Sequence, residues 1–73
     1  MKIEHIKDIG AVIRQRRKSV HMSIAELSAM IPCSPRLLGE VERGTRKVSF
    51  DMAITICSLL GIELYARERE ENK

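Results

Sequence analysis

Between Ser23 and Gly44 the chain carries two helix start signals and two helix stop signals in close succession. Ser23 with Glu26 has the spacing of a capping box, in which each side chain accepts a hydrogen bond from a backbone N–H at the helix start. Pro32 disfavours helical geometry at the residue before it and so ends this helix. Ser34-Pro35 is a second start signal, because serine caps a helix and proline is tolerated at its first position. The segment therefore predicts two short helices joined by a tight turn, with Gly44 as a left-handed stop.

One further helix is expected on each side of this pair. Apolar residues at helical spacing predict a helix from about Asp8 to Lys18 or Ser19. These residues are Ile6, Ile9, Val12 and Ile13. A fourth helix is expected from Ser49 to Gly61, again because its apolar residues form one stripe. The stripe consists of Ala53, Ile56, Cys57 and Leu60, and Ile54 and Leu59 are expected to widen it.

After Gly61 the apolar residues alternate with polar ones. The alternating residues are Ile62, Leu64 and Ala66. A period of two is typical of a strand, and a lone strand needs a partner for its unpaired edge. The same strand of a second copy would supply that partner, which predicts a two-fold homodimer. A fifth helix over Ala66–Glu71 is the alternative, and Glu68–Lys73 is expected to be a frayed, charged end.

Composition limits the chain to one small domain with an aliphatic core. It has 73 residues, of which Phe50 and Tyr65 are the only Phe, Trp or Tyr. A domain of this size is marginally stable alone. Cys33 and Cys57 lack the spacing of a zinc site, so we expect no metal and assign both to the core. Unpaired core cysteines favour a reducing, cytoplasmic setting.

Other function classes are disfavoured by what the pattern lacks. We find no nucleophile with a base, no carboxylate pair in a pocket and no glycine-rich phosphate loop, so we expect no enzyme and no cofactor. We also expect no signal peptide and no membrane span. The net charge is +3, with the densest basic cluster between Arg14 and Lys18. A moderate basic excess fits phosphate binding, although a solvated helix face would carry the same charges.

The second helix of the central pair is expected to have two unlike faces. Leu38 and Val41, with part of Leu37, can face the core. The outward positions are Arg36, Gly39, Glu40 and Arg43. A short helix with an anchored face and a polar face suits the major groove of DNA, while a preceding helix crosses the backbone.

The order and spacing of these signals resemble the lambda-repressor-like, or XRE, helix-turn-helix family. The resemblance covers roughly Ile9 to Leu64. The matching positions are Ile9-Gly10, Ile13-Arg14, Arg17, Met22-Ser23, Glu26-Leu27-Ser28, Ser34, Glu42-Arg43-Gly44 and Leu59-Leu60-Gly61-Ile62. It implies an all-α fold of four helices with a short C-terminal β-strand that pairs across a dimer. Residues 1–61 would form the DNA-binding domain, and residues 62–73 the dimerisation strand and charged tail.

The resemblance also implies roles for residues of the recognition helix. Arg36 and Glu40 match outward positions that read bases, Arg36 by donating to guanine and Glu40 by accepting from cytosine N4. For Arg36, a merely solvated side chain is the alternative. For Glu40, which would repel phosphates, an ion pair with Arg36 is the alternative. Ser23 and Ser34 match positions that meet phosphate through backbone N–H groups, and plain helix capping is the competing and compatible reading.

Two further groups of residues take roles from the same resemblance. The loop after the recognition helix matches the segment that grips the DNA backbone, with a merely solvated loop as the alternative. Its residues are Arg43, Thr45, Arg46 and Lys47. Arg17 and Glu42 match a structural ion pair that the family buries between the first helix and the end of the third.

The sequence departs from the family at two positions. Ile24 stands where a glutamine commonly touches phosphate and neighbouring bases, so that contact should be missing. Pro32 stands where a glycine usually adopts a positive φ, whereas proline is held near about −65°. The turn must therefore take another path, and a tilt of the recognition helix would follow.

A narrower similarity, to HipB-type antitoxins, lies in residues 34–44 and 60–64. Those proteins dimerise through a C-terminal strand, bind operator DNA upstream of their own operon and hold a HipA-type serine/threonine kinase toxin. The resemblance implies a cytoplasmic, nucleoid-associated autorepressor that neutralises such a toxin. Two alternatives remain: a stand-alone XRE regulator, or a protein–protein inhibitor or scaffold that has lost DNA readout. Ile24, Pro32 and Glu40 favour the second alternative.

Overall fold

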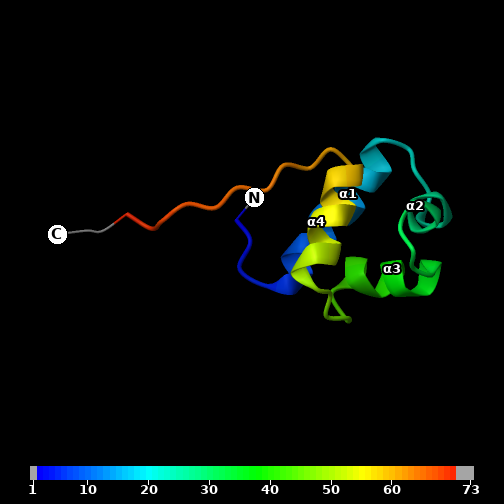
Figure 1. Cartoon of the computed structure of the whole chain (residues 1–73), viewed down its shortest axis with the longest axis horizontal. Coiled ribbons are helices and arrows are strands. Elements are labelled where there is room, and N and C mark those ends of the chain that lie inside the picture. The colour runs from blue at the N-terminus through cyan, green and yellow to red at the C-terminus, as the bar shows by residue number, and fades with distance from the viewer. Residues whose placement is uncertain (1, 71–73) are drawn as a thin grey trace.

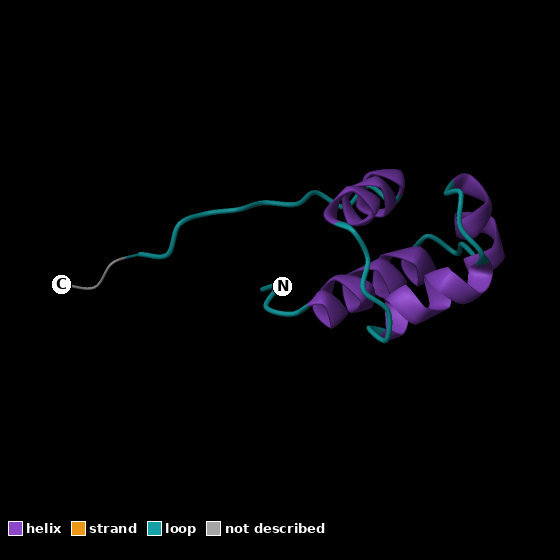
Figure 2. Ribbon diagram, turned by 60° about the horizontal axis from the view of Figure 1, so that its bottom comes forward, coloured by secondary structure: helices purple, strands orange, loops and turns teal. Residues whose placement is uncertain are grey.

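The computed structural model describes residues 2–70, and its regular elements in that range are helices. These are α1 (Ile6–Ser19), α2 (Ile24–Met30), α3 (Pro35–Arg43) and α4 (Phe50–Leu59). Helix α1 packs against α3 and α4, while α2 packs against α3. Figures 1 and 2 show the four helices gathered at one end, with the C-terminal segment leading away from them. The predicted all-α, four-helix fold is confirmed.

Serine side chains start three of the helices. The hydroxyls of Ser23, Ser34 and Ser49 accept hydrogen bonds from backbone N–H groups in the first turns of α2, α3 and α4. Helix α1 begins at Ile6, two residues earlier than expected. The reason is that Asp8 caps from inside the helix: its carboxylate accepts from the N–H groups of Glu4 and His5, both at 2.9 Å.

The core is a single aliphatic cluster to which every helix contributes. Its fully enclosed large residues include Ile13 of α1, Leu27 of α2, Leu38 of α3 and Ile56 of α4, all 0% exposed. Cys57 lies in the same cluster and Cys33 packs against it. Burial raises the pKa of both thiols, because the thiolate is poorly solvated there.

The buried apolar stripe of α4 is narrower than expected. The stripe of Ala53, Ile56, Cys57 and Leu60 is buried. Ile54 and Leu59 do not widen it, since they are 42% and 39% exposed. The expectation for these two residues is wrong because α4 packs mainly against α1, so that only one side of it is covered.

A close approach of backbones fixes α3 against α1. Gly10 of α1 is buried at the crossing. A Cβ added there would overlap the carbonyl oxygen of Val41 and lie 2.9 Å from that of Glu42. Only glycine leaves room for the α3 backbone at this distance, so Gly10 allows α3 to pack this closely on α1.

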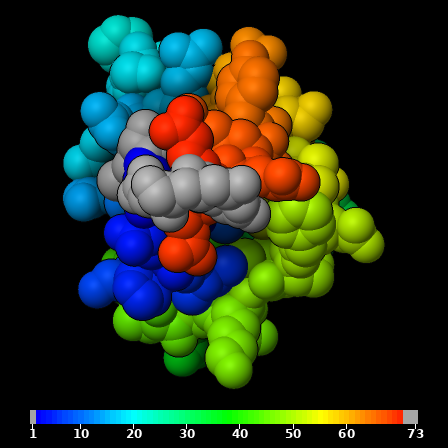
Figure 3. Space-filling view, turned by 90° about the vertical axis from the view of Figure 1, so that its left-hand side faces the viewer, coloured from blue at the N-terminus to red at the C-terminus, as the bar shows by residue number. Residues whose placement is uncertain are grey.

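Residues 62–70 form no helix or strand within the described chain. The fifth helix considered over Ala66–Glu71 is therefore not formed as far as Glu70, while Glu71 lies outside the described residues. Ile62 is still tied to α4, because its N–H donates to the carbonyl of Cys57 at 2.8 Å. The segment then leaves on the same side of the molecule as the N-terminus, shown in red and blue in Figure 3.

Candidate nucleic-acid interface

The turn between α2 and α3 is built around Pro32. Ile31 is extended, with φ −114° and ψ 137°, as expected for a residue that precedes proline. The N–H of Cys33 donates to the carbonyl of Ile31 at 2.6 Å. This bond spans two residues, as in an inverse γ-turn, whose central φ of about −75° suits proline. Among the described residues, positive φ occurs only at His21, Gly44 and Gly61, so the turn follows a path that needs no glycine.

Helix α3 is held at both ends by its own sequence. At its start the Ser34 hydroxyl accepts from the N–H of Leu37 at 3.1 Å. At its end Gly44 adopts φ 75°, and its N–H donates to the Val41 carbonyl at 3.1 Å. The N–H of Thr45 reaches back to the Glu40 carbonyl at 3.0 Å. These two bonds form a Schellman motif, which stops the helix and turns the chain into the next loop.

The two faces of α3 differ as the sequence indicates, with one correction. Leu38 and Val41 are buried, and the Arg36 side chain is 89% exposed. Gly39, expected to face solvent, is buried. The Arg43 side chain covers it: the Nη1 atom would lie 3.2 Å from a Cβ built on Gly39. The glycine is hidden by a flexible side chain of its own helix and not by the core.

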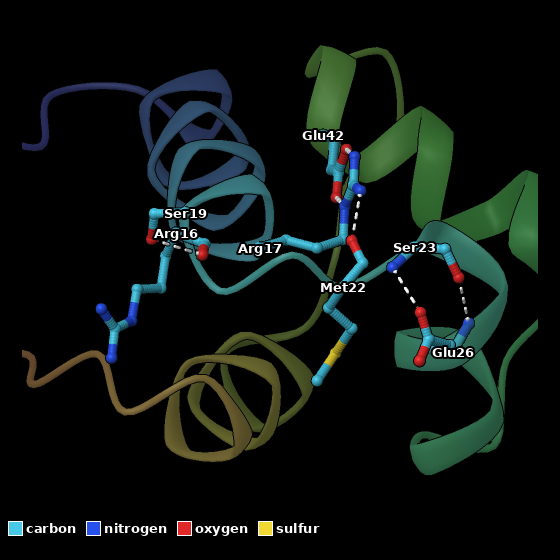
Figure 4. Close-up of polar contacts among 7 residues, drawn as sticks. All are labelled: Arg16, Arg17, Ser19, Met22, Ser23, Glu26 and Glu42. Carbon is cyan, nitrogen blue, oxygen red and sulfur yellow. Dashed lines mark hydrogen bonds and ion pairs between the residues drawn. The ribbon is translucent and has the colours of Figure 1, made fainter.

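Arg17 and Glu42 form a buried ion pair that ties α3 to α1. Arg17 donates from Nε and Nη2 to the two oxygens of Glu42, at 2.7 and 3.0 Å. Its Nη1 donates to the carbonyl of Met22 at 2.8 Å, in the segment that leads into α2 (Figure 4). The hydrogen bond to Glu42 raises the pKa of Arg17 above its ordinary value. One guanidinium therefore joins α1, α3 and the start of α2.

Glu40 lies between two arginines at the exposed side of α3. Its carboxylate is 3.9 Å from Nε of Arg36 and 3.8 Å from Nη1 of Arg46. The backbone carbonyl of Glu40 also accepts from the Thr45 hydroxyl at 3.3 Å. The ion pair considered between Arg36 and Glu40 is thus present, and a second one reaches into the loop after α3.

The sequence comparison agrees with this geometry. A family model described as helix-turn-helix matches residues 13–66, which includes α2, α3 and α4. The chain belongs to the helix-turn-helix family. A search of curated proteins finds no match.

Membership of the helix-turn-helix family indicates a DNA-binding regulatory domain of the XRE type, a class that is not typically enzymatic. Within residues 2–70, no helix is long and apolar enough to cross a membrane. The same range contains no group of three His, Cys, Asp or Glu side chains that could hold a metal ion.

At the start of the helix-turn-helix, the Ser23 N–H already has an acceptor. It donates to the Glu26 carboxylate at 2.9 Å, while the Ser23 hydroxyl accepts from the Glu26 N–H at 3.0 Å (Figure 4). The bond from the backbone N–H holds the pKa of Glu26 below its ordinary value. In this arrangement a carboxylate occupies the Ser23 N–H, through which the resemblance implied a phosphate contact, so the geometry favours capping for Ser23.

Arg43, expected in the loop after the recognition helix, is instead the last residue of α3, and the loop begins after it. The side chains of this helix end and of the loop face solvent. Arg43, Thr45, Arg46 and Lys47 are exposed. Arg43 extends over Gly39 and Arg46 over Glu40. Thr45 is engaged with α3 through its N–H and its hydroxyl. The loop is therefore linked to the helix that precedes it, and its Arg46 lies with Arg43 of α3 beside the exposed face of that helix.

Two residues have structural roles that the sequence analysis does not predict. Gly10 matches a position of the family, and the one sequence signal for its packing role is a glycine inside a helical pattern. Arg16 donates from Nε to the Leu60 carbonyl at 2.8 Å, which joins α1 to the end of α4. A basic residue near a helix end gives no indication of which distant carbonyl it will reach. The sequence therefore carries no signal for this contact.

The residues expected to pair across a dimer lie at the start of the C-terminal segment. Ile62 is partly buried, whereas Leu64 and Ala66 are exposed. Tyr65, on the opposite side of the alternation, is 86% exposed, and its hydroxyl donates to Glu63 at 3.1 Å. Beyond Ile62 the apolar side chains of this segment are open to solvent in the single chain.

Proposed function

We propose that this helix-turn-helix protein is a sequence-specific transcriptional repressor that places α3 in the major groove of operator DNA. The observation that carries the proposal is the division of α3: Leu38, Val41 and Glu42 anchor it, while Arg36 and Arg43 remain exposed. The basic loop that follows begins beside Arg43, at the C-terminal end of α3. In this arrangement Arg36 donates to a guanine and the loop residues contact phosphates.

Two substitutions separate base reading from backbone binding. Arg36→Ala should weaken binding to the selected operator by about 1–3 kcal/mol and relax its specificity. Lys47→Ala should weaken binding to all sequences alike and reduce the slope of log affinity against log salt by about 0.9. Arg69→Ala, which removes an equal charge from the segment that leads away from α3, is the control. Gel shifts on duplexes selected from a random library measure all three, and unchanged operator binding in Arg36→Ala contradicts reading by α3.

We also propose that the protein acts as a homodimer through residues 62–66. The exposed apolar side chains of Leu64 and Ala66, and an N–H and C=O edge without regular pairing in residues 62–70, support this pairing. A two-fold dimer would place two copies of α3 on half-sites about one helical turn apart. Removing residues 64–73 keeps Ile62 and should halve the mass in solution. An unchanged dimer, or a monomeric full-length chain, contradicts the proposal.

The narrower proposal is an antitoxin function of the HipB type. The sequence similarity in residues 34–44 and 60–64 supports it, and it carries with it autorepression in the cytoplasm and inhibition of a HipA-type kinase toxin. Identifying the product of the adjacent gene and purifying it with this chain tests the idea. A neighbouring kinase that does not co-purify with the chain contradicts it, and a neighbour of another kind favours a stand-alone regulator.

One observation favours a protein–protein module instead. Two carboxylates, those of Glu26 and Glu40, lie at the N-terminus of α2 and on the face of α3, where DNA phosphates would approach. A gel shift with DNA upstream of the gene, at low and high salt, distinguishes the two. Absence of binding at both salt concentrations supports the module and overturns the DNA-binding proposal.

A further inference from the structure

Glu40 forms two ion pairs that contribute too little to protein stability to explain their presence. Its side chain is 26% exposed, and the two arginines it faces are 89% and 57% exposed. Exposed ion pairs with N–O distances of 3.8 and 3.9 Å contribute little to stability. Such ion pairs exchange easily for other partners. Their main effect is therefore on the binding of any other group that competes for the same arginines.

The backbone of the same residue also takes part in the motif that ends α3. The Glu40 carbonyl accepts from both the N–H and the hydroxyl of Thr45, at 3.0 and 3.3 Å. Arg46 follows directly in the chain, and its guanidinium returns to the Glu40 carboxylate. Arg36 approaches that carboxylate from the preceding turn of α3. Glu40 thus joins a helix residue suited to bases and a loop residue suited to phosphates.

We propose that Glu40 is a specificity-determining residue that acts by holding Arg36 and Arg46. This inference rests on the proposed DNA-binding function and adds a mechanism to it. On an arbitrary sequence the carboxylate remains beside the phosphates and competes with them for both arginines, which weakens binding. On a site that presents a cytosine N4 amino group, the carboxylate accepts from the base and releases the arginines to guanine and phosphate.

The first experiment compares Glu40→Gln with Glu68→Gln, which removes the same charge from the segment that leads away from α3 (Figure 1). Affinity is measured at several salt concentrations on a duplex selected from a random library by the wild type, and on an unselected duplex of equal length. Glu40→Gln should bind the unselected duplex more tightly, with a salt slope steeper by roughly one. The ratio of selected to unselected affinity should fall about tenfold. Glu68→Gln should leave the ratio unchanged.

Each contrary result has its own meaning. An unchanged ratio overturns the inference. Weaker binding to the selected duplex alone, with no gain on the unselected one, means that the carboxylate contacts a base without restraining the arginines, and this also overturns it. If the wild type selects no duplex, the proposed function fails first, and retention on heparin still tests the restraint. Glu40→Gln should elute at higher salt than Glu68→Gln, and equal elution overturns the inference.

A second pair of variants separates the ion pairs from simple charge repulsion. Glu40→Asp keeps the charge but withdraws it by one methylene, so it should move in the same direction as Glu40→Gln. A variant that behaves like the wild type overturns the proposed restraint. Adding Arg46→Gln to Glu40→Gln should abolish most of the gain on unselected DNA, because the released arginine is then absent. Thermal unfolding midpoints of all variants should match the wild type, and a large decrease would assign Glu40 a structural role.

Discussion

The Arg17 guanidinium shows how much of this fold depends on one side chain. It donates to Glu42 and to the Met22 carbonyl, and the side chains of Arg17 and Glu42 are only 8% and 3% exposed. Burying two charges costs several kcal/mol, which the mutual attraction offsets only when the geometry is good. Among the described residues, every buried side-chain nitrogen and oxygen atom has a hydrogen-bond partner. Losing either partner would leave the other charge inside the protein.

Glu42→Gln should therefore lower the free energy of unfolding by roughly 3–5 kcal/mol. The amide keeps the shape of the carboxylate but leaves the Arg17 charge without a counter-charge. Urea denaturation measures the loss, and Glu68→Gln, in the exposed segment after α4, should stay within about 0.5 kcal/mol of the wild type. A loss below about 1 kcal/mol in Glu42→Gln would show that the pair is not what orients α3.

Gly10 and Gly39 should respond oppositely to the same substitution. Gly10→Ala forces the new methyl group against the α3 backbone, which should cost at least about 1–3 kcal/mol. Gly39→Ala meets only the flexible Arg43 side chain and gains helix propensity, so it should stabilise the protein by up to about 1 kcal/mol. Thermal unfolding of the two variants checks both signs. A destabilised Gly39→Ala would mean that Arg43 cannot move aside.

At the scale of the element, α4 is anchored by one stripe and exposes the rest of its apolar residues. Ile56 is 0% and Ile54 42% exposed, although they lie in the same helix. Ile56→Ala should cost about 2–5 kcal/mol through lost burial and the cavity left behind. Ile54→Ala should stay within about 0.5 kcal/mol. Equal losses in urea denaturation would place Ile54 in an interface that the single chain does not show.

The capping box of α2 should make stability depend on acid pH. The folded-state pKa of Glu26 is lowered by its bond from the Ser23 N–H, so its contribution is fully present above the unfolded pKa and is lost as pH falls through the folded value. The difference in unfolding free energy between the wild type and Glu26→Gln should therefore shrink below pH 4.5. Ser49→Ala removes a cap without a carboxylate and should cost about 1 kcal/mol at every pH. A constant difference for Glu26→Gln would contradict the assignment.

The ends of α2 and α3 were predictable because their signals act within one turn. Ser34, Pro35 and Gly44 bound α3 where expected, and Ser23 with Glu26 forms the expected capping box. That box already implies an occupied Ser23 N–H, so the competition with phosphate was readable from sequence.

The exposure of individual side chains was less predictable. The exposure of Gly39 depends on the rotamer of Arg43, and the exposure of Ile54 depends on how many helices cover α4. Both are properties of neighbours that periodicity does not encode. Likewise, Pro32 predicts that the turn avoids a positive φ, but not which backbone bond closes it.

At the scale of the molecule, four helices share one core, and the segment after α4 adds little to it. Ile62 is the only residue of 62–70 that packs against the core cluster. A chain of this size has a modest margin of stability alone, and association of two copies would add to it.

If the protein dimerises through residues 62–66, its thermal unfolding midpoint should rise with protein concentration, because association stabilises the folded state by mass action. A chain lacking residues 64–73 should show a midpoint that is independent of concentration. Scanning calorimetry over a hundredfold concentration range checks both. A concentration-independent midpoint in the full chain would contradict a dimer coupled to folding.

The two-faced construction of α3 has an evolutionary consequence. Its anchors, Leu38, Val41 and Glu42, are buried, and Gly10 meets only its backbone. The side chains that face outward, Arg36 and Arg43, carry little of the folding energy. Substitutions at these positions would therefore leave the fold intact, so a duplicated gene would be free to drift toward a different target while its product stayed folded at every step.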